Sequence, residues 1–387
     1  MTNAAPGGAK GTAALRINPL DVVVLIPSLH PDHLLPEYVD DLIAHGFTRI
    51  LVVDDGSGPE YAPLFDDLKT RPACTVIGYP VNGGKGHALK HGIRYIQQNW
   101  PDTPGIVTAD SDGQHTAPDL LKVTQAVAEH PGTLVLGSRD FKADNVPGKS
   151  RAGNRLTSFF FALLYGKWLP DTQTGLRGFT MDLAPLMLEV PGDRFEYEMN
   201  MLILASSRHI GFHLVTIQTI YLEENRRTHF RPFHDSVRIY GQLFKNFFKY
   251  ASASGLSTAL DIILFTILDK WLLPLTRLNP DAMVLWDVSW HVLLATAIAR
   301  SVSAVFNFKA NKSFVFRIEK SKGAFPRYVL LAVVVMVLSA TLVSTLHEWL
   351  GVDRTVLKII IDTCLFFINY RLQRSWVFAD HALERNA

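Results

Sequence analysis

Four long apolar segments follow one another in the last third of the 387-residue sequence, and they restrict its fold more than any other feature. They lie near residues 250–273, 289–308, 328–346 and 356–370. A helix needs about 20 apolar residues to cross a bilayer, and the first three segments reach that length. The fourth is shorter and carries Lys358 and Asp362. The pattern predicts an all-α domain of four transmembrane helices over residues 250–378, with burial in a soluble core as the alternative.

The basic residues between these segments predict their orientation. Six lie between the second and third segments: Lys309, Lys312, Arg317, Lys320, Lys322 and Arg327. The connection between the first and second segments holds only Lys270 and Arg277. The positive-inside rule therefore places both termini and the first half of the chain in the cytosol. Residues 1–19 lack the apolar run of a signal peptide and are expected to be a flexible N-terminus, with residues 379–387 as a tail.

An internal repeat divides the predicted membrane domain. Asn307-Phe308-Lys309 and the following Lys312–Phe316 match Asn369-Tyr370-Arg371 and Arg374–Phe378 with the same spacing. Upstream, Phe248-Lys249-Tyr250 is similar to Pro326-Arg327-Tyr328. The repeat predicts two copies of a two-helix unit in parallel orientation.

Three ionisable residues lie inside the apolar segments: Asp261, Arg300 and Asp362. Such residues are costly in a bilayer and are usually paired or functional. Arg300 and Asp362 each lie seven residues before the repeated asparagine, with opposite charge. We therefore expect an ion pair between them.

Basic and aromatic residues alternate in residues 226–249, just before the first apolar segment. From Ser236 on, the apolar residues recur at helical spacing. A helix of this composition is typical of a membrane surface with anionic headgroups. The pattern predicts an interfacial linker helix, and a linker packed on the preceding domain is the alternative.

Residues 20–225 have the pattern of an α/β domain. Apolar runs of strand length alternate with stretches of helical length such as 34–45 and 86–98; the runs are 22–26, 50–53, 75–78, 106–109 and 134–137. This alternation predicts parallel strands joined by crossover helices. Ligands of such folds bind at the carboxyl ends of the strands. Polar loops follow the runs there, at residues 27–33, 54–58, 110–115 and 138–140.

The strongest chemical motif in these loops is Asp110-Ser111-Asp112-Gly113-Gln114-His115. Two carboxylates and a side-chain amide at a strand end suit a hard cation such as Mg²⁺ or Mn²⁺. A polar turn is the alternative, because Asp and Gly also serve turn geometry. Two further loops support the site interpretation. Asp54 and Asp55 are placed to hold a nucleoside, and Asn82–Gly86 offers backbone N–H groups and Lys85 to phosphate, although it is not a Walker A loop.

Together these stretches resemble the family 2 glycosyltransferases, which have a GT-A fold, and among them the dolichol- or polyprenyl-phosphate mannosyltransferases. The matching stretches are Val23–Ser28, Val52–Gly58, Asn82–Gly86, Thr108–His115, Gly137–Arg139, Asp171–Phe179 and Phe195–Met201. The resemblance covers about residues 20–240. The membrane half resembles the four-helix GtrA-like family through its helix number and its repeated motif. The resemblance implies a plasma (inner) membrane location.

The resemblance implies roles for individual residues. Pro27 and Asp54 are expected to contact the nucleotide of the donor, as are Asp55, Lys85, Asp110 and Arg231. The Asp110, Asp112 and Gln114 side chains are the expected metal ligands. The first loop departs from the family pattern, because His30-Pro31-Asp32 stands where an acidic residue usually follows an asparagine. The choice between a uridine and a guanosine donor therefore stays open.

The acceptor side is expected among basic residues. Arg139, Lys149, Arg151 and Arg155 lie within 17 residues of each other, and arginine binds phosphate in a bidentate manner. A solvated basic loop is the alternative. The resemblance points to an acceptor-phosphate site formed by Arg139, Arg151 and Arg155. The apolar residues 159–164 that follow either guide a lipid tail or belong to the core.

Two more stretches are expected beside the reaction centre. The first, Asp171–Phe179, contains Asp171 and Arg177, which are candidate catalytic residues together with Asp112 and Arg139. The alternative is that Asp171 and Arg177 form a structural pair that holds this stretch. In Phe195–Met199, a glutamate either contacts sugar hydroxyls or favours the start of a helix.

The implied activity is the inverting transfer of one sugar from a nucleotide-diphosphate sugar to polyprenyl phosphate by a metal-dependent enzyme. A processive polysaccharide synthase, or transport of the lipid-linked sugar by the membrane half, is the alternative. Nucleic acid is not an expected partner, because the net charge is only +2, and a homo-oligomer is possible. Two cysteines do not make a disulfide framework, and the fourteen histidines show no zinc motif.

Overall fold

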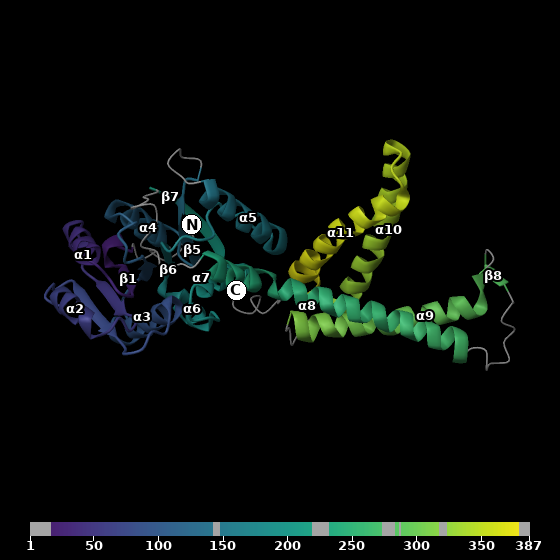
Figure 1. Cartoon of the computed structure of the whole chain (residues 1–387), viewed down its shortest axis with the longest axis horizontal. Coiled ribbons are helices and arrows are strands. Elements are labelled where there is room, and N and C mark those ends of the chain that lie inside the picture. Colours follow the sequence, from purple (N-terminus) through teal and green to yellow (C-terminus); the bar gives the residue numbers. More distant parts are fainter. Residues whose placement is uncertain are drawn as a thin grey trace, which may run out of the picture. The chain divides into compact units, whose positions relative to one another are not determined.

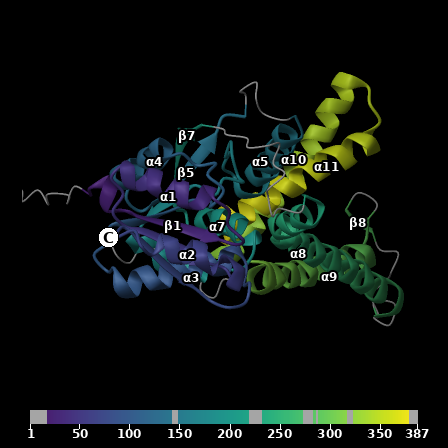
Figure 2. The same cartoon turned by 60° about the vertical axis from the view of Figure 1, so that its left-hand side comes forward.

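The computed structural model describes residues 17–141, 148–218, 232–272, 283–285, 288–316 and 323–378 (Figures 1 and 2). The chain divides into two compact units. The first unit comprises Met1–Ser158 and Leu169–Ile239, and the second comprises Phe159–Trp168 and Tyr240–Ala387. Cys74 and Cys364 are both free thiols, as the sequence predicts.

A seven-stranded sheet forms the centre of the first unit, in the order β3-β2-β1-β4-β6-β5-β7. The strands are β1 (Val23–Ser28), β2 (Ile50–Asp54), β3 (Cys74–Gly78), β4 (Gly105–Thr108), β5 (Thr133–Arg139), β6 (Arg177–Thr180) and β7 (Gly211–Ile217). Strands β3, β2, β1 and β4 are parallel neighbours. Strand β6 is antiparallel to both β4 and β5. The parallel direction predicted for the five apolar runs is confirmed in β1 to β5. The sequence pattern does not predict β6, which begins with Arg177-Gly178 and carries no apolar run.

Helices cover both faces of this sheet. They are α1 (Leu34–Ala44), α2 (Ala62–Leu68), α3 (Lys85–Asn99), α4 (Ala117–Glu129), α6 (Ala184–Glu189) and α7 (Glu196–Ser207), and α5 (Gly148–Tyr165) follows β5. In Figures 1 and 2, α1 and α4 lie on the opposite side of the sheet from α3. Val24 and Ile26 of β1 share the core of α1 and α4. Leu25, between them, points the other way and contacts Gly92 of α3, as expected for the two-residue period of a strand.

The parallel register brings the predicted loops to one edge. Ser28 at the end of β1 pairs with Asp54 at the end of β2, and Leu25 of β1 pairs with Thr108, the last residue of β4. Residues 138 and 139, predicted in a loop, are instead the last two residues of β5. Pro27, predicted at a loop start, lies within β1. The polar residues after β2 and β4 therefore gather at the carboxyl edge of the sheet.

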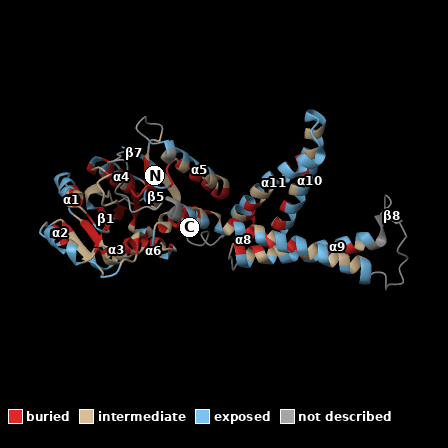
Figure 3. Ribbon diagram, in the orientation of Figure 1, coloured by how far each residue is buried: buried red, intermediate tan, exposed pale blue. Residues whose placement is uncertain are grey.

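The second unit is helical. Its long helices are α8 (Pro232–Ile267), α9 (Trp290–Ala310), α10 (Ala324–Leu350) and α11 (Arg354–Leu372), with a short hairpin of β8 (Met283–Leu285) and β9 (Val288–Ser289). Three helices are long and apolar enough to cross a membrane among the residues described: Val237–Trp271, Val292–Val315 and Ala324–Leu350. The fourth predicted span forms α11, which is not one of them and carries Arg354, Lys358 and Asp362. Figure 3 shows α8 to α11 mainly in the colours of exposed and intermediate residues, with few buried ones.

Helix α8 is continuous across residues 249 and 250. The structure therefore contains no break between the predicted linker helix and the first predicted span. Val237 and Phe248 in this part of α8 are more than half exposed, and Leu243 is fully buried. The helix thus combines an apolar exposed surface with a packed face.

The internal repeat is visible in the fold. Helix α9 ends in a π-helical turn at Asn311–Val315, and α11 ends in a matching turn at Gln373–Val377. The buried amides of the two turns meet, since Asn311 Nδ2 donates to Gln373 Oε1 at 3.0 Å. A π-helical turn at the same place in both copies supports the repeat that the sequence predicts.

The expected ion pair between Arg300 and Asp362 is wrong. Arg300 Nη2 lies 3.4 Å from Asp261 Oδ2, and Asp362 Oδ2 lies 2.7 Å from Lys358 Nζ. Each pair forms inside its own repeat, across α8 and α9 in the first and along α11 in the second. A carboxylate with a basic neighbour in its own helix pair needs no partner from the other copy.

Candidate functional site

The Asp110 motif begins two residues after the end of β4 and meets two other elements. Lys85, the first residue of α3, places its Nζ 2.6 Å from Asp110 Oδ1 and 2.8 Å from Glu198 Oε1 of α7. The two carboxylates raise the pKa of Lys85 despite its burial. The glycine-rich loop therefore directs its lysine at the Asp110 motif. Sequence reasoning missed Glu198 as the third member, because α7 lies far along the chain from both partners.

The two aspartates of the motif differ in their pKa values. Burial opposes ionisation of Asp110, but the Lys85 ammonium outweighs it and lowers the pKa of Asp110 to about 2. For Asp112, burial together with the Asp110 charge outweighs the effect of Lys85 and raises the pKa to about 6. Asp112 Oδ1 accepts the N–H of Gln114 at 3.1 Å, which folds the motif back on itself. The Asp112 carboxylate thus lies beside a like charge and favours a further cation.

His115 fixes the backbone of the motif. The Asp110 N–H donates to His115 Nδ1 at 3.1 Å, and burial lowers the pKa of this histidine. A neutral imidazole that accepts at Nδ1 serves as a structural brace rather than as a charged group.

Gly175 lies against Asp110. A Cβ added to this glycine would come within van der Waals overlap of Asp110 Oδ2. The loop that precedes β6 therefore packs directly on the motif, and only a residue without a side chain fits there.

Asp55 does not face outward to hold a nucleoside, which corrects the prediction for this residue. It is 3 % exposed, and its Oδ1 accepts the N–H of Gly83 at 2.8 Å and the hydroxyl of Tyr79 at 2.7 Å. The Gly84 N–H also donates to this carboxylate. Asp55 therefore occupies the backbone N–H groups that the sequence assigns to phosphate, and holds the loop that carries Lys85.

Replacing Asp55 with alanine is expected to destabilise the protein by about 2–3 kcal/mol, because two buried N–H groups lose their acceptor. Thermal unfolding of the full chain checks this. Replacing the exposed Asp66 of α2 with alanine should leave the midpoint within about 1 °C. Loss of nucleotide affinity in Asp55→Ala with unchanged thermal stability would contradict the structural role.

Asp54 is more open than its neighbour. Its Oδ1 accepts the N–H of Ser57 at 2.9 Å, and it lines a cavity of about 180 Å³ together with Gly58 and Lys69. It lies at the carboxyl end of β2, and its contact with a donor stays a prediction.

Arg139 and Asp171 form a two-pronged ion pair. Arg139 Nε lies 2.7 Å from Asp171 Oδ2, and Nη2 lies 3.1 Å from Oδ1. The Asp171 side chain is completely buried, and that of Arg139 is 25 % exposed. The same carboxylate accepts the N–H of Gln173 at 3.0 Å. The alternative pairing of Asp171 with Arg177 is therefore wrong, and Asp171 holds both its own loop and the end of β5.

Arg177 is buried rather than open to a substrate, with 1 % of its surface exposed. Its Nε donates to the Thr174 carbonyl at 2.9 Å, and its Nη1 donates to the Glu198 carbonyl. Burial lowers the pKa of this guanidinium. Arg177 thus joins the loop before β6 to α7, and its predicted catalytic role stays a prediction.

The remaining basic residues lie on α5. Arg151 and Arg155 are exposed and four residues apart, so they share one face of the helix. Asn154, between them, is buried and accepts the Thr172 N–H at 3.2 Å. Helix α5 is thus anchored to the Asp171 loop. Arg231 and the side chain of Lys149 lie outside the described residues.

The donor set of the motif fits a hard divalent cation. Asp112 and Gln114 present oxygen ligands on one short turn, and the Asp110 charge remains partly exposed beside them. No cluster of three or more His, Cys, Asp or Glu side chains with metal spacing occurs in the parts of the chain that the structure describes. Two protein ligands with open positions are what a Mg²⁺ or Mn²⁺ ion shared with substrate phosphates requires.

Known proteins resemble both units. Residues 23–184 match glycosyl transferase family 2, and residues 249–378 match the GtrA/DPMS transmembrane domain. An uncharacterized protein of Methanocaldococcus jannaschii, MJ1222, is 30 % identical over 54 % of this chain and 84 % of its own length. A UDP-N-acetylglucosamine–dolichyl-phosphate N-acetylglucosaminyltransferase of Methanococcus voltae is 28 % identical over 52 % of this chain and 86 % of its own length.

A third relative, the glycosyltransferase AglJ of Haloferax volcanii, is 25 % identical over 62 % of this chain and 78 % of its own length. These matches agree with the resemblance that the sequence motifs carry. They also agree with the mixed α/β sheet of the first unit and the apolar helices of the second. The chain belongs to glycosyl transferase family 2 and is a membrane-bound glycosyltransferase with a C-terminal GtrA/DPMS transmembrane domain.

Proposed function

We propose that the enzyme transfers one sugar from a nucleotide-diphosphate sugar to a polyprenyl phosphate, with inversion at the anomeric carbon. The observation that carries this proposal is the cluster at the carboxyl edge of the sheet, where Asp110, Asp112 and Lys85 meet. The relative from Methanococcus voltae, whose name includes a dolichyl-phosphate acceptor, supports the choice of acceptor. The apolar helices of the second unit are long enough to cross the membrane in which such a lipid resides.

The donor side is assigned to the Asp110 motif. Asp112 and Gln114 would hold a Mg²⁺ or Mn²⁺ ion, with Asp110 kept ionised by Lys85. When bound, the metal supplies charge neutralisation for the diphosphate that leaves. Asp54 at the end of β2 contacts the nucleoside in this proposal, and so does Pro27 of β1, which pairs with Val53, the residue before Asp54.

The acceptor side needs positioning more than proton transfer. A phosphate monoester has a second pKa near 6 and is largely dianionic at pH 7, so it attacks without a strong base. Arg151 and Arg155, on the exposed face of α5, hold this phosphate. Arg139, fixed by Asp171, adds positive charge at the end of β5. Catalysis then consists of alignment and charge stabilisation, and a single displacement gives inversion.

Replacing Arg151 and Arg155 together with glutamine is expected to raise the KM for polyprenyl phosphate about tenfold or more, because each charged hydrogen bond contributes about 1.5–3 kcal/mol at most. The kcat and the KM for the donor should change little. Arg94→Gln on α3, also exposed, is the matched control and should behave like the wild type. An unchanged acceptor KM in the double variant would move the acceptor site elsewhere.

The reaction is tested with the purified full chain, Mg²⁺ or Mn²⁺, polyprenyl phosphate and a panel of radiolabelled uridine and guanosine nucleotide sugars. We expect one donor to give label that extracts into organic solvent. The anomeric configuration of the product, read by NMR from its coupling to the neighbouring proton, should be opposite to that of the donor. Retention of configuration would contradict the single displacement.

We also propose that the site faces the cytosol. Nucleotide sugars are the donors in this account, and the positive-inside rule places the basic residues between the second and third apolar segments, and the first unit, on that side. Labelling of single cysteines introduced at the first unit and at the α10–α11 turn, from outside intact cells, separates the two sides.

A further inference from the structure

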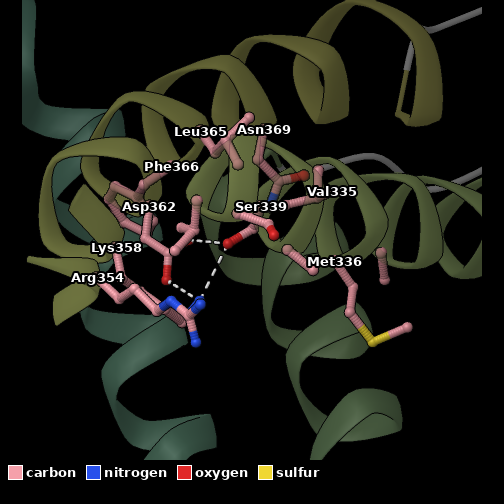
Figure 4. Close-up of a pocket in the computed structure, with 13 residues that line it drawn as sticks. Val335, Met336, Ser339, Arg354, Lys358, Asp362, Leu365, Phe366 and Asn369 are labelled. Carbon is pink, nitrogen blue, oxygen red and sulfur yellow. Dashed lines mark hydrogen bonds and ion pairs between the residues drawn. The ribbon is translucent and has the colours of Figure 1, made fainter. Parts of the chain in front are cut away.

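A cavity of about 680 Å³ lies between α10 and α11 in the second unit (Figure 4). Helix α11 contributes Arg354, Lys358 and Asp362, one helical turn apart. Helix α10 contributes Ser339 and Met336 from the other side. The cavity therefore combines two basic groups and one carboxylate in a helix pair that belongs to the membrane domain.

Lys358 and Asp362 largely satisfy each other. Lys358 Nζ lies 2.7 Å from Asp362 Oδ2 and donates to Ser339 Oγ at 3.0 Å, as the dashed lines in Figure 4 show. Ser339 in turn donates to Asp362. Arg354 has no hydrogen-bond or ion-pair partner among the described residues, although it lines the same cavity. The three charged groups leave a surplus of one positive charge.

The equivalent positions of the first repeat carry no surplus of positive charge. Asp261 and Ser339 each follow the repeated tyrosine by eleven residues, and Arg300 and Asp362 are likewise equivalent. In the first repeat, Arg300 and Asp261 form a neutral pair. The positions equivalent to Arg354 and Lys358 are Val292 and Thr296, which carry no charge. The positive charge is thus specific to the cavity of the second repeat.

The walls of this cavity suit an amphiphile. Val335, Leu365 and Phe366 line it, and Met336 is 64 % exposed at its side. The basic residues lie in the first two turns of α11. Arg354 is the first residue of this helix, and Lys358 lies about 6 Å further along the helix axis. A helix end with basic residues next to apolar surface lies at the depth of lipid headgroups in a bilayer.

We propose that the α10–α11 cavity binds the phosphodiester headgroup of an anionic bilayer phospholipid, with Arg354 and Lys358 on the phosphate and an acyl chain along α10. The single negative charge of such a headgroup balances the single positive charge of the site. A zwitterionic phospholipid brings no net charge and is disfavoured. This site goes beyond the sugar transfer proposed above, and its test does not depend on that activity.

Native mass spectrometry of the detergent-solubilised full chain tests the proposal, with phosphatidylglycerol and phosphatidylcholine as the two probes. The wild type should retain one phosphatidylglycerol at least about fivefold more strongly than phosphatidylcholine, since one basic residue near a membrane surface contributes that much. Arg354→Gln should abolish this preference. Lys270→Gln removes an exposed charge of the second unit outside the cavity and should preserve it.

Asp362→Asn is a second variant, and its expected result is a gain in lipid retention, which a folding defect would not produce. It removes the negative charge of the cavity while amide and lysine still form a hydrogen bond, so phosphatidylglycerol retention should increase about fivefold. Equal retention of the two phospholipids by the wild type would overturn the proposal, as would an Arg354→Gln variant with wild-type preference. Retention of a polyprenyl-phosphate sugar in place of phosphatidylglycerol would overturn the assigned occupant.

Discussion

Asp112→Asn will lower the rate of sugar transfer at least about 100-fold, the scale of removing one group that stabilises developing charge. Asparagine keeps the size of aspartate and can still accept the Gln114 N–H. It lacks the negative charge that attracts a divalent cation. Retention of Mn²⁺, measured by the electron paramagnetic resonance signal of free Mn²⁺, should weaken at least about tenfold in the same variant.

The stability of Asp112→Asn distinguishes this role from a structural one. Burial and Asp110 raise the pKa of Asp112 to about 6, so the ionised side chain opposes folding at pH 7. Its neutral replacement should therefore unfold at the same temperature as the wild type or higher. Asp102→Asn, at an exposed aspartate before β4, is the matched control for both assays. A variant that keeps more than a tenth of the wild-type rate would remove Asp112 from the site.

Asp171→Ala will lower the thermal unfolding midpoint by roughly 6–12 °C. Removing one partner of a buried ion pair costs about 3–5 kcal/mol, and the partial exposure of Arg139 brings this toward the lower end. Each kcal/mol corresponds to about 2–4 °C for a domain of this size. The buried carboxylate also accepts the backbone N–H of Gln173, which loses its partner in the variant.

Two comparisons test whether the loss of stability comes from the Arg139–Asp171 ion pair itself. Asp182→Ala, at an exposed aspartate after β6, should change the midpoint by less than about 2 °C. In a double-mutant cycle, Arg139→Ala should cost much less in the Asp171→Ala background than in the wild type. Additive effects would show that Arg139 and Asp171 act independently.

The sequence predicts the α/β first half and the helices of the second half because their apolar periods are long and regular. It fails for β6, whose residues Arg177–Thr180 are buried through their place between β4 and β5 rather than through an apolar run. It predicts α11 as a helix but not that the charged residues of this helix line a cavity. In both cases the neighbours in space, not the local pattern, decide the environment.

The motifs indicate which residues belong to the candidate site. They do not show which of these residues are exposed and which are buried in contacts with other parts of the protein. Asp54 and Asp55 are adjacent in sequence, yet one is partly exposed and the other is the buried acceptor of the glycine loop. Asp171 lies in the loop before β6 and Arg177 begins that strand, and each pairs with a group elsewhere. Charge and spacing predict that such residues pair. The strand register and the position of α7, which depend on the whole fold, determine with which partner.

The measurement that tests the central claim most directly compares two acceptors that differ in one group. The full chain is incubated with its labelled nucleotide sugar and either polyprenyl phosphate or the corresponding polyprenol, and label is counted in the organic phase. The account predicts label with polyprenyl phosphate alone, because the phosphate is both the nucleophile and the group that the arginines bind. Transfer to polyprenol at a comparable rate, or to neither lipid, would contradict it.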